Sequence, residues 1–150
     1  MYADDVIEEL NSFLRGEISA VETYAIALEK ISAPHIHAEL VRCQNSHRER
    51  VNRLTQKVVA LGGDAATQSG VWGAFAKLTE GGARLFGMRA ALAALEQGED
   101  HGRDDYRRGL HKLVGSNVRP FVEELLTRQL DTHGIVSGLL HDQDTAHRTV

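Results

Sequence analysis

Apolar residues recur at alternating steps of three and four in four stretches of the chain, and this spacing restricts how the chain can fold. In the first stretch, from Asp4 to Ser32, the repeat begins at Ile7, Leu10 and Leu14. Such steps place side chains on one face of an α-helix, whereas a half-buried strand alternates in steps of two. We therefore predict four helices, each with an apolar seam that packs on its neighbours.

Breaks in the pattern mark the ends of these helices. Pro34 suits the first turn of a second helix, which is predicted to run to Leu61 and to stop at the two glycines that follow. A third helix is predicted from Arg84 to Leu113, and Gly115 separates it from a fourth that reaches Leu140. Residues 142–150 are predicted to form a frayed tail.

The segment 63–82 is predicted to be a long connection. Its twenty residues hold several turn-forming side chains and one short apolar cluster, which we interpret as a lid packed on the bundle. A connection of this length can run along the bundle and make the second and third helices parallel. The apolar cluster consists of Val71, Trp72, Phe75 and Leu78. The sequence thus predicts one domain over residues 1–150, an all-α ferritin-like four-helix bundle with a crossover between helices two and three.

Charge and cysteine content exclude several classes of partner. The formal net charge is −4, and basic residues are interspersed with acids, so a nucleic-acid partner is not expected. The only cysteine, Cys43, cannot form an intramolecular disulfide, and no stretch has the ~18 apolar residues of a membrane span. Residues 1–9 lack the features of a secretory signal. We therefore expect a cytoplasmic protein with no membrane partner.

Polar residues interrupt the seam of every predicted helix. Burial of an unpaired charge costs roughly several kcal/mol. Buried acids and imidazoles therefore usually pair with one another or coordinate a metal ion. The interruptions are Glu17 in the first stretch, Gln44 and His47 in the second, Glu99 in the third, and Gln129 and His133 in the fourth.

Counting from the turns indicates that these side chains meet. Glu17 lies 17 residues before Pro34, and His47 lies 13 residues after it. Glu99 lies 16 residues before the turn at Gly115, and His133 lies 18 residues after that turn. All four side chains are therefore predicted to lie near the middle of the bundle.

Two carboxylates and two imidazoles are a ligand set suited to iron, manganese or zinc. We predict metal ligands at Glu17, His47, Glu99 and His133, with Glu96 as an additional ligand or bridge in a mononuclear or dinuclear site. Two alternatives stay open at this point. A buried Glu–His pair can satisfy itself without metal, and the glycines near the layer could make room for a small apolar ligand.

The chain resembles known proteins in several of these stretches. The run from Leu10 to Tyr24, LNSFLRGEISAVETY, resembles the first helix of bacterioferritins and rubrerythrins, and the resemblance implies that Glu17 is a metal ligand. The combination of this run with other motifs resembles a bacterial family of ferritin-like proteins of unknown function. Those motifs are HRERVNRL from His47, LGG from Leu61, SGVWGAFA from Ser69 and ALEQGED from Ala94.

The ferritin-like di-iron pattern has one Glu from each of two helices and Glu-x-x-His from each of the other two. Here Gln44 stands three residues before His47, and Leu130 stands three residues before His133. The leading hypothesis is therefore a metal-binding bundle with an incomplete di-iron-type site and an oxidant-handling or metal-handling role. Enzymatic activity is left undecided, and a homo-oligomer is compatible with the fold. The alternative is a metal-free structural or stress-related bundle that acts through protein association.

Overall fold

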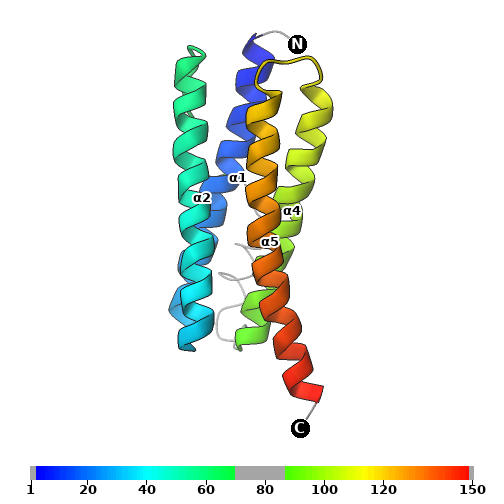
Figure 1. The fold of residues 1–150 in the computed structure, drawn as a ribbon. Coiled ribbons are helices and arrows are strands. Elements are labelled where there is room, and N and C mark those ends of the chain that lie inside the picture. Colours follow the sequence, from blue (N-terminus) through cyan, green and yellow to red (C-terminus); the bar gives the residue numbers. More distant parts are fainter. Residues whose placement is uncertain (1–2, 70–86, 149–150) are drawn as a thin grey trace.

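In the part of the chain that the structure describes, four long helices form a bundle (Figure 1). The computed structural model describes residues 3–69 and 87–148. Within these ranges there are no strands, and the predicted all-α four-helix bundle is confirmed. The helices are α1 (Ala3–Lys30), α2 (Pro34–Ala60), α4 (Met88–Lys112) and α5 (Arg119–Arg148).

The ends of α2 follow the predicted breaks, whereas α5 is longer than expected. Pro34 occupies the first turn of α2, and Gly62 ends the helix with a φ of 85°, a conformation that favours glycine. Helix α5 continues to Arg148, although a frayed tail was predicted from residue 142. An ion pair of 2.6 Å between Arg89 Nε and Asp144 Oδ1 ties this last part of α5 to α4.

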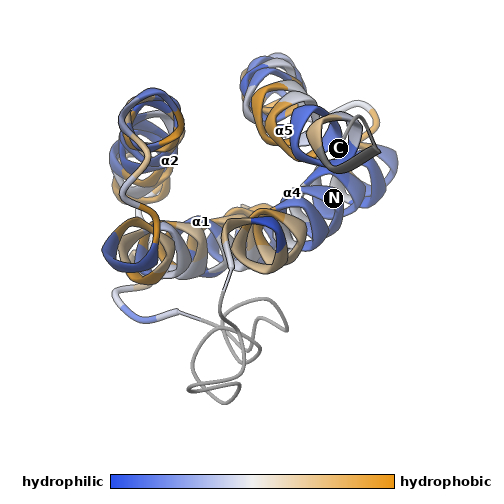
Figure 2. Ribbon diagram, turned by 90° about the horizontal axis from the view of Figure 1, so that it is seen from below, coloured by the Kyte–Doolittle hydropathy of each residue, from blue (hydrophilic) through white to orange (hydrophobic). Residues whose placement is uncertain are grey.

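The helices are arranged as two antiparallel hairpins that pack side by side. Helix α1 packs on α2 and α4 packs on α5, while α1 also contacts α4 and α2 contacts α5 (Figure 2). Helices α2 and α4 run in the same direction, as the predicted crossover requires (Figure 1).

The described part of the crossover lies along α1. The side chain of Asn11 donates to the Asp64 carbonyl at 2.9 Å and accepts from the Ala66 amide at 2.8 Å. Further along, the Ser69 hydroxyl donates to Glu22 at 3.0 Å. The predicted apolar cluster beginning at Val71 lies outside the described residues.

The apolar core consists of two clusters at opposite ends of the bundle. One surrounds Tyr24 and Leu95, and the other surrounds Leu14 and Leu125. Buried polar side chains from all four helices lie in the layer between them. They are Glu17, Gln44, His47, Arg50, Glu99, Gln129 and Thr132.

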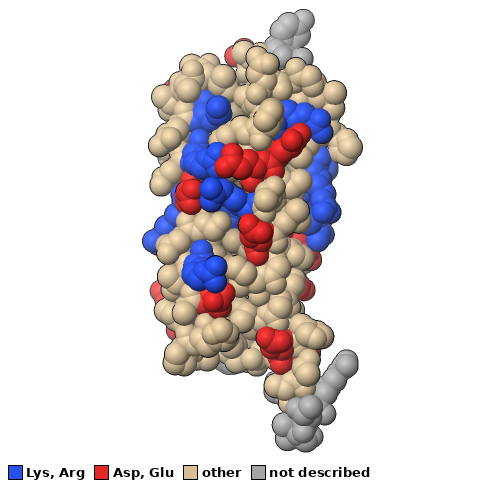
Figure 3. All heavy atoms as spheres, viewed as in Figure 1, with Lys and Arg blue, Asp and Glu red and all other residues tan. Residues whose placement is uncertain are grey.

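The exposed face of α2 and α5 carries interspersed charges of both signs (Figure 3). Arg53 pairs with Glu124 at 2.9 Å and Arg128 pairs with Glu49 at 3.2 Å, so both pairs link α2 to α5. Exposed pairs of this kind contribute about 0–1 kcal/mol each. None of the helices in the described ranges has the length and hydropathy needed to cross a bilayer.

Candidate metal centre

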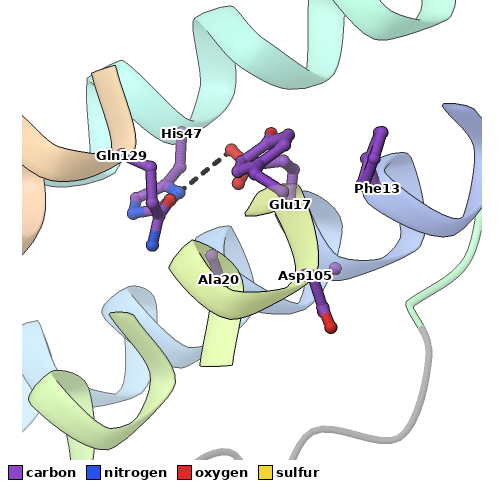
Figure 4. Close-up of a pocket in the computed structure, with 9 residues that line it drawn as sticks. Phe13, Glu17, Ala20, His47, Asp105 and Gln129 are labelled. Carbon is purple, nitrogen blue, oxygen red and sulfur yellow. Dashed lines mark hydrogen bonds and ion pairs between the residues drawn. The ribbon is translucent and has the colours of Figure 1, made fainter. Parts of the chain in front are cut away.

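Three predicted site residues from three helices meet in the polar layer. Nδ1 of His47 on α2 lies 3.0 Å from Oε2 of Glu17 on α1, a contact drawn in Figure 4. Nε2 of the same ring lies 2.6 Å from Oε1 of Glu99 on α4. All three side chains are buried, and Glu99 is 0% exposed. The structure therefore brings Glu17, His47 and Glu99 to a common level inside the bundle.

The imidazole of His47 is hydrogen bonded at both ring nitrogens. A carboxylate only accepts hydrogen bonds when ionised, and an imidazole donates from both nitrogens only when it carries two protons. Burial and the nearby Arg50 oppose protonation, but Glu17 and Glu99 outweigh them and raise the pKa of His47. Burial also opposes the charge of Glu99, yet His47 and Arg50 hold the pKa of Glu99 below its usual value. We infer that an imidazolium lies between two carboxylates.

Arg50 completes this layer, and the sequence analysis did not identify it. Its side chain is 0% exposed, and its Nε lies 3.2 Å from Glu17 Oε2. The guanidinium also donates to Gln129 Oε1 and, at 3.1 Å, to Thr132 Oγ1 on α5. Arg50 follows His47 by three residues, so the helical repeat places both side chains on one face of α2. That spacing was the available signal. With two carboxylates, one imidazolium and one guanidinium, the layer has no net charge.

Glu99 accepts hydrogen bonds from side chains on the other three described helices, α1, α2 and α5. Besides His47, the Tyr24 hydroxyl donates to it at 2.7 Å. From α5, Gln129 Nε2 and Thr132 Oγ1 each donate to Oε2 of Glu99 at 2.8 Å. A buried carboxylate with this many donors is stabilised in its ionised form.

The structure does not bring the other two predicted ligands into the layer. Nε2 of His133 lies 2.5 Å from Asp100 Oδ1, and the His133 side chain is 20% exposed at the surface between α4 and α5. Glu96 is partly buried and accepts from the Ser137 hydroxyl at 2.7 Å. The polar partners of these two residues are thus Asp100 and Ser137, and not Glu17, His47 or Glu99.

The register of α5 explains the position of His133. An inward-facing seam can continue from Gln129 by a step of three residues or of four. The prediction from the sequence assumed the step of four, to His133. In the structure the side chains that face inward are those of Gln129 and Thr132, which are at most 2% exposed, while Leu130 is 42% exposed. The position equivalent to the second ligand histidine is therefore Thr132, and its glutamate position is Gln129.

A small cavity lies beside Glu17 in this layer (Figure 4). Its volume of about 10 Å³ corresponds to about one water molecule. Gly102 borders the cavity. A Cβ at this position would lie 2.7 Å from Gln129 Nε2, so a larger residue would displace that amide. The Tyr106 hydroxyl is buried and has no hydrogen-bond partner among the described residues. The cavity is lined by Phe13, Gly16, Glu17, Ala20, His47, Gly102, Asp105, Tyr106 and Gln129.

The two buried tyrosines make a matched test of this network. We expect Tyr24→Phe to lower the free energy of unfolding by about 2 kcal/mol, because its hydroxyl donates to the charged Glu99. We expect Tyr106→Phe to be close to neutral, because it removes a buried hydroxyl that no described residue satisfies. Equilibrium denaturation by urea measures both values. Equal losses in the two variants would contradict the hydrogen-bond assignment.

Comparison with known proteins identifies the family. The model of a family described as a domain of unknown function (DUF2383) matches residues 5–112. The chain belongs to this family. The predicted resemblance to a ferritin-like family of unknown function is thereby confirmed. A comparison with curated proteins gave no match.

One solved structure has the same fold as this DUF2383 protein. It is described as ferritin like, diiron-carboxylate proteins from Bacillus anthracis str. Ames. The TM-score is 0.65 at 19% identity, and the match covers 97% of this chain and 99% of the other. At this level of identity the similarity establishes the fold and not the site chemistry.

The residues of this DUF2383 protein do not fit the two-metal pattern of the ferritin-like fold. That pattern needs four carboxylates and two histidines. In the register that the structure shows, Gln44 and Gln129 occupy two glutamate positions and Thr132 occupies a histidine position. Within residues 3–69 and 87–148, no three His, Cys, Asp or Glu side chains are arranged to hold a metal ion. In addition, Arg50 brings a fixed positive charge into contact with Glu17.

Proposed function

We propose that this protein is a metal-independent ferritin-like bundle that acts as a structural or association protein. The observation that supports the proposal most directly is the buried guanidinium of Arg50, bonded to Glu17, Gln129 and Thr132. A divalent cation beside a guanidinium would be repelled in a medium of low dielectric constant. The layer is also neutral already, so it lacks the excess negative charge that attracts a metal ion.

In this proposal the polar layer holds the four helices in one register. Glu17, His47 and Glu99 link α1, α2 and α4, and Arg50 extends the network to Gln129 and Thr132 on α5. Buried polar groups can specify one arrangement of helices, because any shift in register leaves some of them unpaired.

The size of the cavity beside Glu17 bears on where the protein acts. A space of about 10 Å³ accommodates about one water molecule, whereas pockets for organic ligands are on the order of 300–1,000 Å³. This argues against the small apolar ligand considered from the sequence. It supports a role in which partners are met at the outer surface of the bundle.

The second candidate is a mononuclear site for iron, manganese or zinc at Glu17, His47 and Glu99. The close approach of two carboxylates and one imidazole from three helices favours it. For these residues to bind metal, His47 would have to lose a proton and Glu17 would have to separate from Arg50. An oxidant-handling role belongs to this candidate and not to the first.

Metal analysis of the wild-type protein distinguishes the two candidates. The protein is treated with chelator, incubated with Fe²⁺ without oxygen, or with Mn²⁺ or Zn²⁺, and desalted before elemental analysis. We expect far less than one metal ion per chain, because the layer is neutral and its two carboxylates are already bonded to His47 and Arg50. Binding of about one ion per chain that Glu17→Gln abolishes would overturn the proposal. His133→Ala is the control for binding at the surface pair of His133 and Asp100.

A further inference from the structure

We infer that Arg50 is the residue that excludes metal from this layer, and that the remaining side chains form a latent site for one divalent cation. The inference rests on the proposed metal-independent function and identifies its cause. It depends on the contact between the Arg50 guanidinium and Glu17, and on the position of His47 between Glu17 and Glu99.

The position that Arg50 occupies is that of a buried positive charge beside a carboxylate. Its guanidinium is buried and lies 3.2 Å from Glu17, so Glu17 would lose its buried cation if Arg50 were replaced by an apolar residue. A divalent ion would supply a positive charge at the same place.

The side chains that would remain are suited to such an ion. Glu17, Glu99 and His47 supply two carboxylates and one imidazole, and three protein ligands plus solvent are typical of catalytic zinc sites. All three side chains are already buried, but Glu17 and Glu99 contact opposite nitrogens of the His47 ring, so binding of one ion by all three requires these side chains to turn. The side-chain oxygen Oε1 of Gln129 accepts from Arg50 and would lose that donor.

Substitution of Arg50 tests the inference in the full-length protein. Arg50→Leu removes the charge and introduces no ligand atom, whereas Arg50→Lys keeps a cation at the same position. Arg53→Leu is the matched control, because Arg53 lies on the same helix but pairs with Glu124 at the surface. Each variant is titrated with Zn²⁺ by calorimetry and with Co²⁺ by visible absorption, which reports the coordination geometry.

We expect Arg50→Leu to bind about one ion per chain and to melt at a higher temperature with the ion than without it. Wild type, Arg50→Lys and Arg53→Leu should show none of these changes. Adding Glu17→Gln to Arg50→Leu should abolish binding, which places the ion in the layer. If Arg50→Leu is insoluble, Arg50→Gln replaces it, because its amide can still donate to Glu17.

The outcomes separate this inference from the proposed function. If the folded Arg50→Leu or Arg50→Gln variant binds no ion while wild type also binds none, the inference is wrong and the proposed function stands. If wild type itself binds an ion in the layer, both are wrong. Binding to Arg50→Leu that persists after Glu17→Gln would place the ion elsewhere and would also overturn the inference.

Discussion

Glu99→Ala is expected to lower the free energy of unfolding by about 3–5 kcal/mol, one of the two largest effects among the substitutions considered. Glu99 accepts from His47, Tyr24, Gln129 and Thr132, and all four donors are buried. Without the carboxylate, the layer keeps two positive charges against one negative charge. Denaturation by urea in the presence of chelator measures the loss, and circular dichroism shows whether the variant still folds.

Glu96→Ala is the matched control on the same helix. Glu96 is partly buried and accepts one hydrogen bond from Ser137, so its loss should cost about 1 kcal/mol or less. The two variants also compare the two carboxylates of α4 that were predicted from the sequence as metal ligands. A loss for Glu99→Ala no larger than that for Glu96→Ala would contradict the network described for the buried layer.

Arg50→Leu is expected to have a similarly large effect in the absence of metal, about 3–5 kcal/mol of destabilisation. The substitution leaves the layer with a net negative charge, because Glu17 loses its contact with the guanidinium at 3.2 Å. It also removes the donor to Gln129 and to Thr132. The same denaturation experiment, with chelator present throughout, measures the change.

A second substitution should restore part of that loss. Glu17→Gln combined with Arg50→Leu returns the layer to zero net charge, since Glu99 and His47 remain paired. We therefore expect the double variant to be more stable than Arg50→Leu alone, as for contacting residues in a double-mutant cycle. Simple additivity of the two single losses would show that Glu17 and Arg50 are not coupled.

The predictions for Glu99→Ala and Arg50→Leu both depend on the balance of positive and negative charge in the polar layer. The ferritin-like di-iron pattern neutralises its carboxylates with metal ions. In this protein two of those carboxylate positions are amides, and a guanidinium and an imidazolium balance the two that remain. The ferritin-like fold and the absence of a suitable ligand cluster in the described ranges are therefore compatible.

The sequence determined the secondary structure and the height of the layer along the bundle. Heptad spacing, Pro34 and the glycines at the turns act locally, so they predict helices and their ends without knowledge of the neighbours. Counting residues from those turns also placed Glu17, His47 and Glu99 at one level, because the rise per residue of an α-helix is constant.

The tertiary structure alone decided which side chains on α5 and α2 face inward. The step from Gln129 to Thr132 and the step to His133 both satisfy a helical seam, and only the structure shows that Thr132 bonds with Glu99 on α4 and Arg50 on α2. In the same way, the sequence alone suggests that the charged Arg50 lies at the surface. Its partners Glu17 and Gln129 belong to two other helices, α1 and α5, so local spacing does not reveal them. The chemistry of the layer depends on these contacts between distant segments, which local spacing does not encode.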